Sequence, residues 1–279
     1  MTASLLQGKK GLITGIINKR SIAYGIAKTL SEYGAELAIT YQNEIIKEKL
    51  SPIADELNVE LILHCDVSNE KIVDNAFEII EKKWGTLDFL VHAIAFSDKN
   101  ELDGKYVNTS LNNFLNAMHI SCYSFTALAQ RAEKMMLNGG SLLTLSYYGA
   151  EKVMPNYNVM GLCKAALEAS VKYIACDLGP QNIRVNAISA GPIRTLASSG
   201  ISDFHFISEW NRNNSPLRRN VTIEDVGKAA LYLLSDLSSG TTGEILHVDS
   251  GYNVVGMKVV DTNKALVSSG SYTTLSGVL

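Results

Sequence analysis

The sequence has few of the residues that build metal centres and disulfide frameworks. Its 279 residues include 4 cysteines, none in a C-x-x-C pair, and 5 histidines that stand apart from one another. Zinc sites and disulfide-stapled domains usually show paired or regularly spaced cysteines and histidines. We therefore expect reduced cysteines, ordinary histidines and no metal site.

The sequence also lacks an excess of charge and a long apolar run. It carries 25 Lys and Arg against 28 Asp and Glu, a net charge of −3, so it has no basic footprint for nucleic acid or an anionic membrane. No apolar run approaches the length of a membrane-spanning helix. The first residues, MTASLLQGKK, lack the pattern of a signal or transit peptide. We expect a cytoplasmic protein that acts on a small molecule.

What the sequence does contain is a regular alternation of short apolar segments with helix-length amphipathic stretches. The apolar segments lie at residues 11–14, 35–41, 59–65, 87–95, 141–146, 183–189 and 243–248. Such strands are typical of a parallel sheet covered by helices on both faces. The sequence therefore predicts an α/β fold, a Rossmann-like doubly wound parallel sheet of about seven strands in a single domain.

Two regions depart from this alternation. Residues 190–216 contain glycine, proline and a short apolar pattern, which predicts a substrate-binding loop with one weakly held helix. Residues 258–279 are rich in Ser, Thr and Gly, and we expect a tail or an oligomer contact there. The catalytic domain is thus predicted to span residues 1–257.

A glycine-containing turn follows the first predicted strand. Gly15 ends that strand, Ser21 stands at the start of the next helix, and Gly25 lies in the first turns of that helix. A tight turn followed by the free amides of a helix N-terminus favours a pyrophosphate. Because the turn is not G-x-G-x-x-G, a turn that binds no nucleotide remains an alternative.

Polar residues follow the next two predicted strands. Gln42 comes after the second strand and Asp66 after the third, at the edge where parallel sheets bind adenosine. A solvated turn residue at Gln42 and a helix cap at Asp66 are the alternatives. No carboxylate at Gln42 holds the ribose, yet no arginine stands beside it for a 2′-phosphate, so NADH is favoured over NADPH.

Two tyrosines and a lysine form the pattern that indicates chemistry. Tyr157 and Lys164 are seven residues apart, a step about 20° short of two helical turns, so we expect them on one helix face. Ordinary short-chain dehydrogenases use Tyr-x-x-x-Lys, which would put the tyrosine at Met160 and a serine at Tyr147. A surface aromatic beside a solvated lysine is the alternative interpretation of this spacing.

The surrounding residues resemble the bacterial enoyl-acyl-carrier-protein reductases of type II fatty acid synthesis, a divergent branch of the short-chain dehydrogenase/reductase family. The resemblance covers roughly residues 5–257. It is carried by S-Y-Y-G-A-E-K, P-N-Y-N-V-M-G-L-C-K-A-A-L-E, V-N-A-I-S-A-G-P-I-R-T and G-x5-S-I-A-Y-G. It implies NADH as cofactor, an enoyl thioester carried on acyl carrier protein as substrate, and a homotetramer.

The resemblance also implies the roles of individual residues. The adenosine and phosphates would be held by Gly15, Ser21, Ile22, Gln42, Asp66, Val67 and Ile94. Lys164, Ile193 and Thr195 would hold the nicotinamide half of the cofactor. The acyl substrate would face Ala95, Phe96, Tyr147, Tyr157 and Phe204. Similar sequences often have serine or glycine at Ala93 and Ala95, so the fit of ligands beside Ala95 is an open question.

The resemblance implies a conjugate reduction, and the hypothesis is that Tyr157, a protonated phenol, donates to the developing enolate. Lys164 would orient the nicotinamide ribose, and Tyr147 would shape the pocket. The apolar residues Leu196, Ile201, Phe204 and Phe206 in an otherwise polar segment predict a lid over the acyl chain, with ordinary packing against the body as the alternative. The positive charge of Arg194, Arg212, Arg218 and Arg219 predicts docking of an acidic carrier protein, with ordinary exposed arginines as the alternative. A ketoreductase and a catalytically silent dinucleotide sensor are the competing functions.

Overall fold

The computed structural model describes residues 4–196, 198 and 202–257. Within them, seven strands form one parallel sheet in the order β3-β2-β1-β4-β5-β6-β7. The strands are β1 (Lys10–Ile13), β2 (Glu36–Tyr41), β3 (Leu61–His64), β4 (Phe89–His92), β5 (Gly140–Ser146), β6 (Ile183–Ala190) and β7 (Ile245–Val248). The predicted doubly wound parallel sheet is confirmed. The predicted tail at 258–279 lies outside the described residues.

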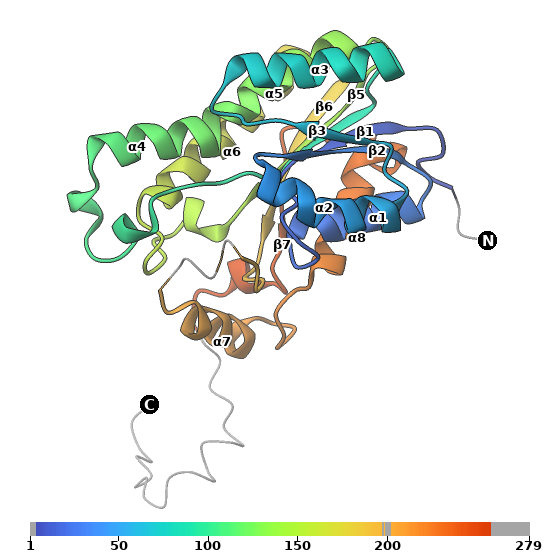
Figure 1. Ribbon diagram of the computed structural model, residues 1–279. Coiled ribbons are helices and arrows are strands. Elements are labelled where there is room, and N and C mark those ends of the chain that lie inside the picture. Colours follow the sequence, from blue (N-terminus) through green and yellow to red (C-terminus); the bar gives the residue numbers. More distant parts are fainter. Residues whose placement is uncertain (1–3, 197, 199–201, 258–279) are drawn as a thin grey trace, which may run out of the picture.

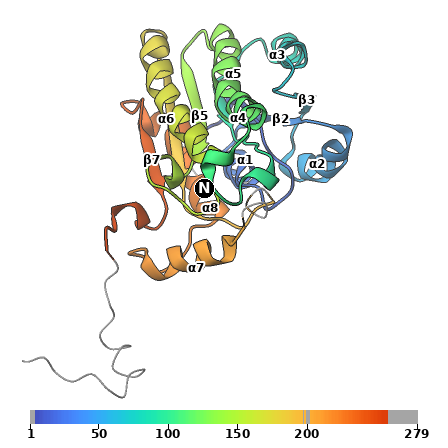
Figure 2. The same ribbon diagram turned by 90° about the vertical axis from the view of Figure 1, so that its left-hand side faces the viewer.

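Helices cover both faces of the sheet (Figures 1 and 2). The helices are α1 (Ile22–Glu32), α2 (Glu44–Leu57), α3 (Glu70–Trp84), α4 (Leu111–Met118), α5 (Ser124–Ala132), α6 (Val159–Leu178), α7 (Phe204–Asn214) and α8 (Ile223–Leu234). Buried side chains of α3, α5 and α6 pack on one face, and those of α1, α2 and α8 on the other. The fold therefore has two hydrophobic cores, one on each side of the sheet.

The strand order reverses between β1 and β4, which are neighbours although they are far apart in sequence. Open parallel sheets bind ligands in the crevice at such a reversal, beyond the carboxyl ends of the strands. Gly15 follows β1 there with φ of 86°, and a Cβ on it would lie 2.0 Å from the carbonyl oxygen of Ala93. Only glycine fits this position, because both the backbone conformation and the close approach exclude a side chain.

Gly25 lies in α1 where this helix contacts α8. A Cβ on Gly25 would lie 2.5 Å from the carbonyl oxygen of Ile223, and a Cβ on Gly227 would lie 2.3 Å from Thr29 Oγ1. The two glycines thus let α1 and α8 pack backbone against backbone. Gly25 fixes the position of α1, and Gly15 alone shapes the turn itself.

Candidate active site

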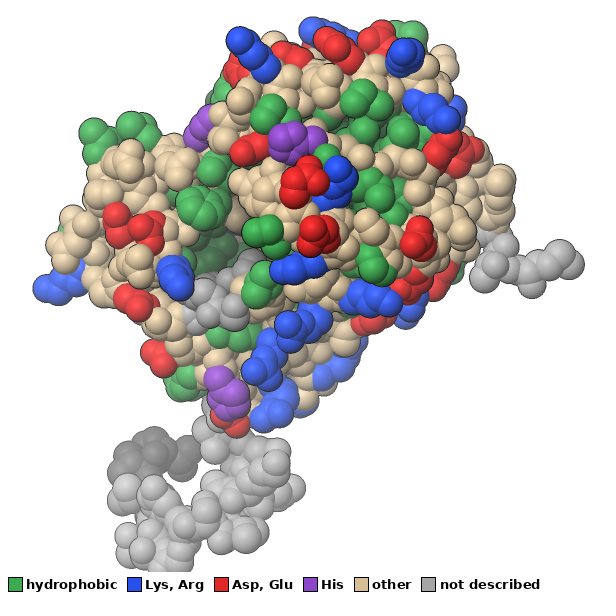
Figure 3. Space-filling model, in the orientation of Figure 1, with side chains coloured by type: hydrophobic (Ala, Val, Ile, Leu, Met, Phe, Trp, Pro, Cys, Tyr) green, Lys and Arg blue, Asp and Glu red, His purple; other side chains and the backbone are tan. Residues whose placement is uncertain are grey.

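The sequence-predicted site residues come together at the carboxyl edge of the sheet. Each follows or approaches the end of a strand: Gly15 after β1, Gln42 after β2, Asp66 after β3, Ile94 and Ala95 after β4, Tyr147 after β5 and Ile193 after β6. The face shown in Figure 3 is hollowed between α4 and α7, and hydrophobic side chains border the hollow. Six separate segments of the chain therefore contribute to one region.

The N-terminus of α1 has the features of an anion site. Ser21 precedes the helix, yet its hydroxyl oxygen accepts from the amides of Ile17 at 3.0 Å and Asn18 at 3.2 Å instead of capping α1. The first turn of α1 contains no acidic residue. The Ser21 side chain thus does not cap α1, and the amides of the first turn, beginning at Ile22, are available to an anion. These donors fit a pyrophosphate.

The two polar strand ends are both consistent with an adenosine site. Asp66 accepts hydrogen bonds from the amide and hydroxyl of Ser68, at 3.0 and 2.7 Å, while Asn69 caps α3. Asp66 is therefore not the helix cap that remained as an alternative. Val67 beside it is buried in the core, and Gln42 is exposed.

Tyr157 is not on the helix that carries Lys164. Helix α6 begins at Val159, and Tyr157 is flanked by Asn156 and Asn158, with φ of 56° and 38°. The expectation of one shared helix face is therefore wrong, because two residues with positive φ interrupt the helical path. Asparagine adopts this conformation more readily than most residues, which explains where the helix stops.

The two tyrosines nevertheless form one buried unit. The rings of Tyr147 and Tyr157 pack edge to face with centroids 5.0 Å apart, and Tyr157 is 8% exposed. A Cβ on Gly149 would lie 2.5 Å from the Tyr157 ring, so this glycine makes room for it. Burial raises the pKa of both phenols above their ordinary value. Both are therefore hydrogen-bond donors over the whole physiological pH range.

Lys164 is hydrogen-bonded to the end of β5. Its side chain is buried in α6, and Nζ donates to the carbonyl oxygen of Leu145 at 2.7 Å, two residues before Tyr147. Burial lowers its pKa to about 8. The ammonium is therefore anchored at the end of β5, the strand that Tyr147 follows, and not through a helix face shared with Tyr157.

A buried polar network beneath Lys164 was not predicted. His92, at the end of β4, is fully buried, with Nδ1 2.8 Å from Thr144 Oγ1 and Nε2 2.8 Å from Ser124 Oγ. Burial lowers its pKa to about 3, so the ring is neutral. The Ser124 hydroxyl also donates to the carbonyl oxygen of Ile120, and the Thr144 hydroxyl donates to that of His92. In the sequence, only the following residues 93–95 indicated that this part of the chain lies near the site.

The residues after β4 that are expected to face the acyl substrate are accessible to solvent. Ala95 and Phe96 are exposed, and Phe96 lines a cavity of about 500 Å³ together with Asn113 and residues of α4. Thr195 is hydrogen-bonded to Ser198, and the Ser198 hydroxyl oxygen accepts from the Thr195 amide at 2.8 Å. Ile193 is half-buried against the core.

Only some of the described apolar side chains in the predicted substrate-binding loop pack against the rest of the protein. Helix α7 begins at Phe204, which is half-buried, whereas Phe206 and Leu196 are exposed and Ile207 is buried. The predicted short helix is confirmed. Ile201, the remaining member of the predicted lid, lies outside the described residues.

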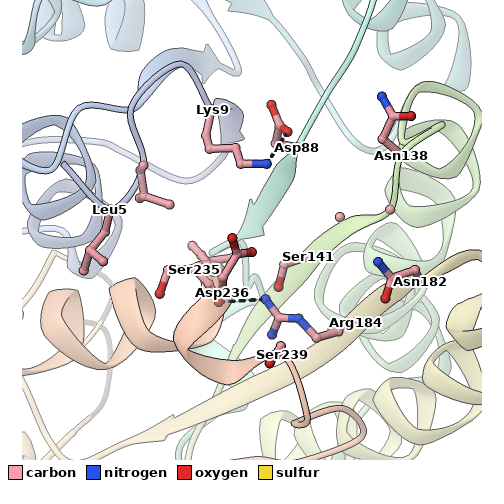
Figure 4. Close-up of a pocket in the computed structure, with 14 residues that line it drawn as sticks. Leu5, Lys9, Asp88, Asn138, Ser141, Asn182, Arg184, Ser235, Asp236 and Ser239 are labelled. Atoms are coloured by element: carbon pink, nitrogen blue, oxygen red, sulfur yellow. Dashed lines mark hydrogen bonds and ion pairs between the residues drawn. The ribbon is translucent and has the colours of Figure 1, made fainter.

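A second cavity, of about 120 Å³, lies at the opposite edge of the sheet (Figure 4). It is lined by residues at the amino ends of the strands, including Lys9, Asp88 and Arg184. Lys9 pairs with Asp88 at 3.1 Å, and Arg184 donates to the carbonyl oxygens of Leu233 and Ser235. None of the sequence-predicted site residues lines this cavity.

The described residues also bear on two other kinds of site. Among these residues, no group of three or more His, Cys, Asp and Glu side chains is arranged to hold a metal ion. None of the helices described is both long and apolar enough to cross a membrane.

The parallel sheet, the helix terminus after β1 and the buried tyrosines and lysine define a protein of the short-chain dehydrogenase/reductase class. Residues 15–253 match the family described as enoyl-(acyl carrier protein) reductase. The chain belongs to this family.

Individual relatives agree with this assignment. Enoyl-[acyl-carrier-protein] reductase [NADH] 1 of Rhizobium meliloti is 61% identical over 259 residues, which are 93% of this chain and 95% of the relative. The crystal structure of the reductase from Anaplasma phagocytophilum in complex with NAD has a TM-score of 0.90 and 66% identity, and covers 93% of this chain and 99% of that one. The Bacillus cereus reductase with NADP+ and indole naphthyridinone has a TM-score of 0.89 and 49% identity, with 91% and 99% covered.

Proposed function

We propose that the protein uses NADH to reduce the trans-2 double bond of enoyl thioesters carried on acyl carrier protein. The observation that carries this proposal is the buried Tyr147–Tyr157 pair beside the end of β5, to which Lys164 is also hydrogen-bonded. Relatives that are 61% identical over nearly the whole chain are named as NADH-dependent reductases of this substrate class.

The donor groups at the carboxyl edge suit a dinucleotide. The pyrophosphate would lie at the N-terminus of α1 with Gly15, Ser21 and Ile22, and the adenosine beside Gln42, Asp66, Val67 and Ile94. Lys164, Ile193 and Thr195 would hold the nicotinamide half. When bound, NADH supplies the hydride that the β-carbon of the enoyl thioester accepts.

The protein itself contributes proton donation and orientation. Negative charge develops on the thioester oxygen, two carbons from the carbon that accepts hydride, and the Tyr157 hydroxyl is the proposed donor to it. Lys164 orients the ribose through its ammonium. Tyr147 packs on the Tyr157 ring and holds it in place.

A ketoreductase would need an acidic proton at position 160. Met160 is buried, with its sulfur 3.8 Å from Ser121 Oγ, and it has no proton to donate. The phenol that is present comes from a turn outside the helix. This difference favours conjugate reduction over carbonyl reduction.

An assay of NADH consumption with crotonyl thioester tests the function. We expect turnover with the enoyl substrate, little with a 3-ketoacyl thioester, and a preference for NADH over NADPH measured in parallel. Tyr157→Phe should lower kcat by about 10²-fold with little change in NADH affinity, because it removes one donor to the developing charge. Binding of NADH without any turnover would instead support the dinucleotide sensor.

The remaining features of the proposal concern the whole chain. Residues 1–257 would form the catalytic domain, with a substrate-binding loop at 190–216 and a tail at 258–279, and the protein would be cytoplasmic. It would assemble as a homotetramer through the long helices. One face of α6 supports this, because its outward side chains at positions 162, 165, 169, 173 and 176 are exposed and mostly apolar.

Acyl carrier protein would dock near the substrate-binding loop, with Leu196, Ile201, Phe204 and Phe206 as the proposed lid. The arginines there are not equivalent. Arg219 is bound to Asp225 through two hydrogen bonds, and Arg212 pairs with Glu209, whereas Arg218 contacts only the Ser215 carbonyl oxygen among the contacts described. Arg194→Glu with Arg218→Glu should slow the carrier-linked substrate more than the free thioester, and equal slowing would exclude docking there.

A further inference from the structure

The segment after β4, residues 93–98, has no strand partner in the described parts of the chain. Side chains from other elements hold its backbone instead. Asn113, from α4, accepts a hydrogen bond from the amide of Asp98 at 2.9 Å. The centre of the segment, Phe96, is held by Ser121.

The hydroxyl of Ser121 bonds to both backbone polar groups of Phe96. It accepts from the Phe96 amide at 2.9 Å and donates to the Phe96 carbonyl oxygen at 3.0 Å. Ser121 is fully buried, and its oxygen lies 3.8 Å from the sulfur of Met160 in the first turn of α6. One side chain therefore contacts both the segment after β4 and the start of the helix next to Tyr157.

A local irregularity of the helix directs this hydroxyl. Between α4 and α5 the chain forms a π-helical turn, His119–Tyr123, and such turns often occur at functional sites. Ser121 in this turn bonds to Phe96, while Ser124, three residues on, bonds to His92. The π-helical turn and the start of α5 thus direct one buried hydroxyl at the segment after β4 and the other at the last residue of β4.

We propose that Ser121 is a positioning residue for the acyl substrate. By fixing the Phe96 peptide it keeps the exposed Ala95 and Phe96 side chains in one place, where Phe96 forms part of the wall of the 500 Å³ cavity. Ser121 itself is buried and acts only through that backbone. This inference rests on the proposed placement of the substrate beside Ala95 and Phe96.

Steady-state kinetics of Ser121→Ala test the proposal. Removing the hydroxyl leaves two backbone groups unpaired, so we expect KM for crotonyl thioester to rise about five- to tenfold, with kcat and the NADH dissociation constant within about twofold of wild type. Ser121→Cys, of nearly the same size, should rescue part of the KM. The matched control is Ser124→Ala, which removes the other buried hydroxyl and should lower the unfolding midpoint without raising KM.

Two outcomes would overturn the positioning role. One is an unchanged KM in Ser121→Ala, and the other is an equal rise in Ser124→Ala, which would mean general loosening of the turn. In a Phe96→Ala background, Ser121→Ala should add less than about twofold to KM, because it acts through Phe96, and full additivity would also contradict the proposal. Turnover by the wild-type enzyme in the same assay tests the proposed function separately.

Discussion

At the scale of single residues, the site depends on backbone conformations that side chains rarely adopt. Asn158 has φ of 38° and ψ of −122°, a sparsely populated combination, and its side-chain amide donates to the carbonyl oxygen of Leu102 at 2.7 Å. Strain of this kind costs about 1–3 kcal/mol and persists only where the surroundings enforce it. Here it turns the chain so that Tyr157 points at Tyr147 before α6 begins.

The buried ammonium of Lys164 should make the protein less stable at neutral pH. Its pKa in the fold is about 8, below the unfolded value of about 10.4, so the unfolded chain binds the proton more tightly. Its contribution to stability therefore rises as pH increases from about 8 to about 10.4. We expect Lys164→Met to raise the free energy of unfolding at pH 7 by about 1–3 kcal/mol, with a smaller gain at pH 10. Urea unfolding at both pH values measures this, and a loss at pH 7 would contradict it.

The same titration should appear in cofactor binding. As pH rises through about 8, Lys164 in the free enzyme loses its proton, and the affinity for NADH should fall. Lys164→Arg, which keeps its charge, should bind NADH with little pH dependence in this range. Fluorescence titrations with NADH between pH 6 and 9.5 test this, and a flat wild-type profile would refute the proposed role.

At the scale of elements, the contact between α1 and α8 fixes the proposed pyrophosphate site. Gly25→Ala places a methyl group 2.5 Å from the Ile223 carbonyl oxygen, so the helices must separate. We expect a loss of about 1–3 kcal/mol in unfolding free energy and weaker NADH binding, because α1 moves. Chemical unfolding and NADH titration measure the two effects.

Gly179 provides the matched control for that substitution. It has φ of −53°, and a Cβ on it would meet nothing within 4 Å. Gly179→Ala should therefore raise the unfolding free energy by about 0.4–1 kcal/mol. If Gly25→Ala were as stable as Gly179→Ala, the close helix contact would not be a real constraint.

At the scale of the whole molecule, the exposed face of α6 should be where copies of the chain associate. Tyr173, which belongs to that face, is 76% exposed, and the other residues of the face are small or apolar. Tyr173→Glu should reduce the proposed tetramer to smaller species in analytical ultracentrifugation, because charge in an apolar interface is costly. Leu137→Glu changes a residue that is 80% exposed outside this face and should leave the assembly intact.

The sequence by itself determined the sheet, the order of its elements and the region of the site. Seven apolar segments at regular spacing leave few alternatives to a parallel sheet, and parallel strands carry the residues that follow them to one edge. Local spacing also located Tyr147, Tyr157 and Lys164. The same spacing wrongly placed Tyr157 on α6, which begins two residues later. The positive φ angles of Asn156 and Asn158 separate Tyr157 from the helix, and this backbone path depends on contacts with distant segments.

Only the tertiary structure decided which polar groups meet. The bonds from Ser121 to Phe96 and from His92 to Ser124 join positions that are 25 and 32 residues apart in sequence. The packing of Gly25 against Ile223 joins α1 to α8, which are still further apart. The periodicity of apolar residues shows which face of a segment is buried. Contacts between distant segments depend instead on how the layers of helices and sheet pack together, and the whole fold determines that packing.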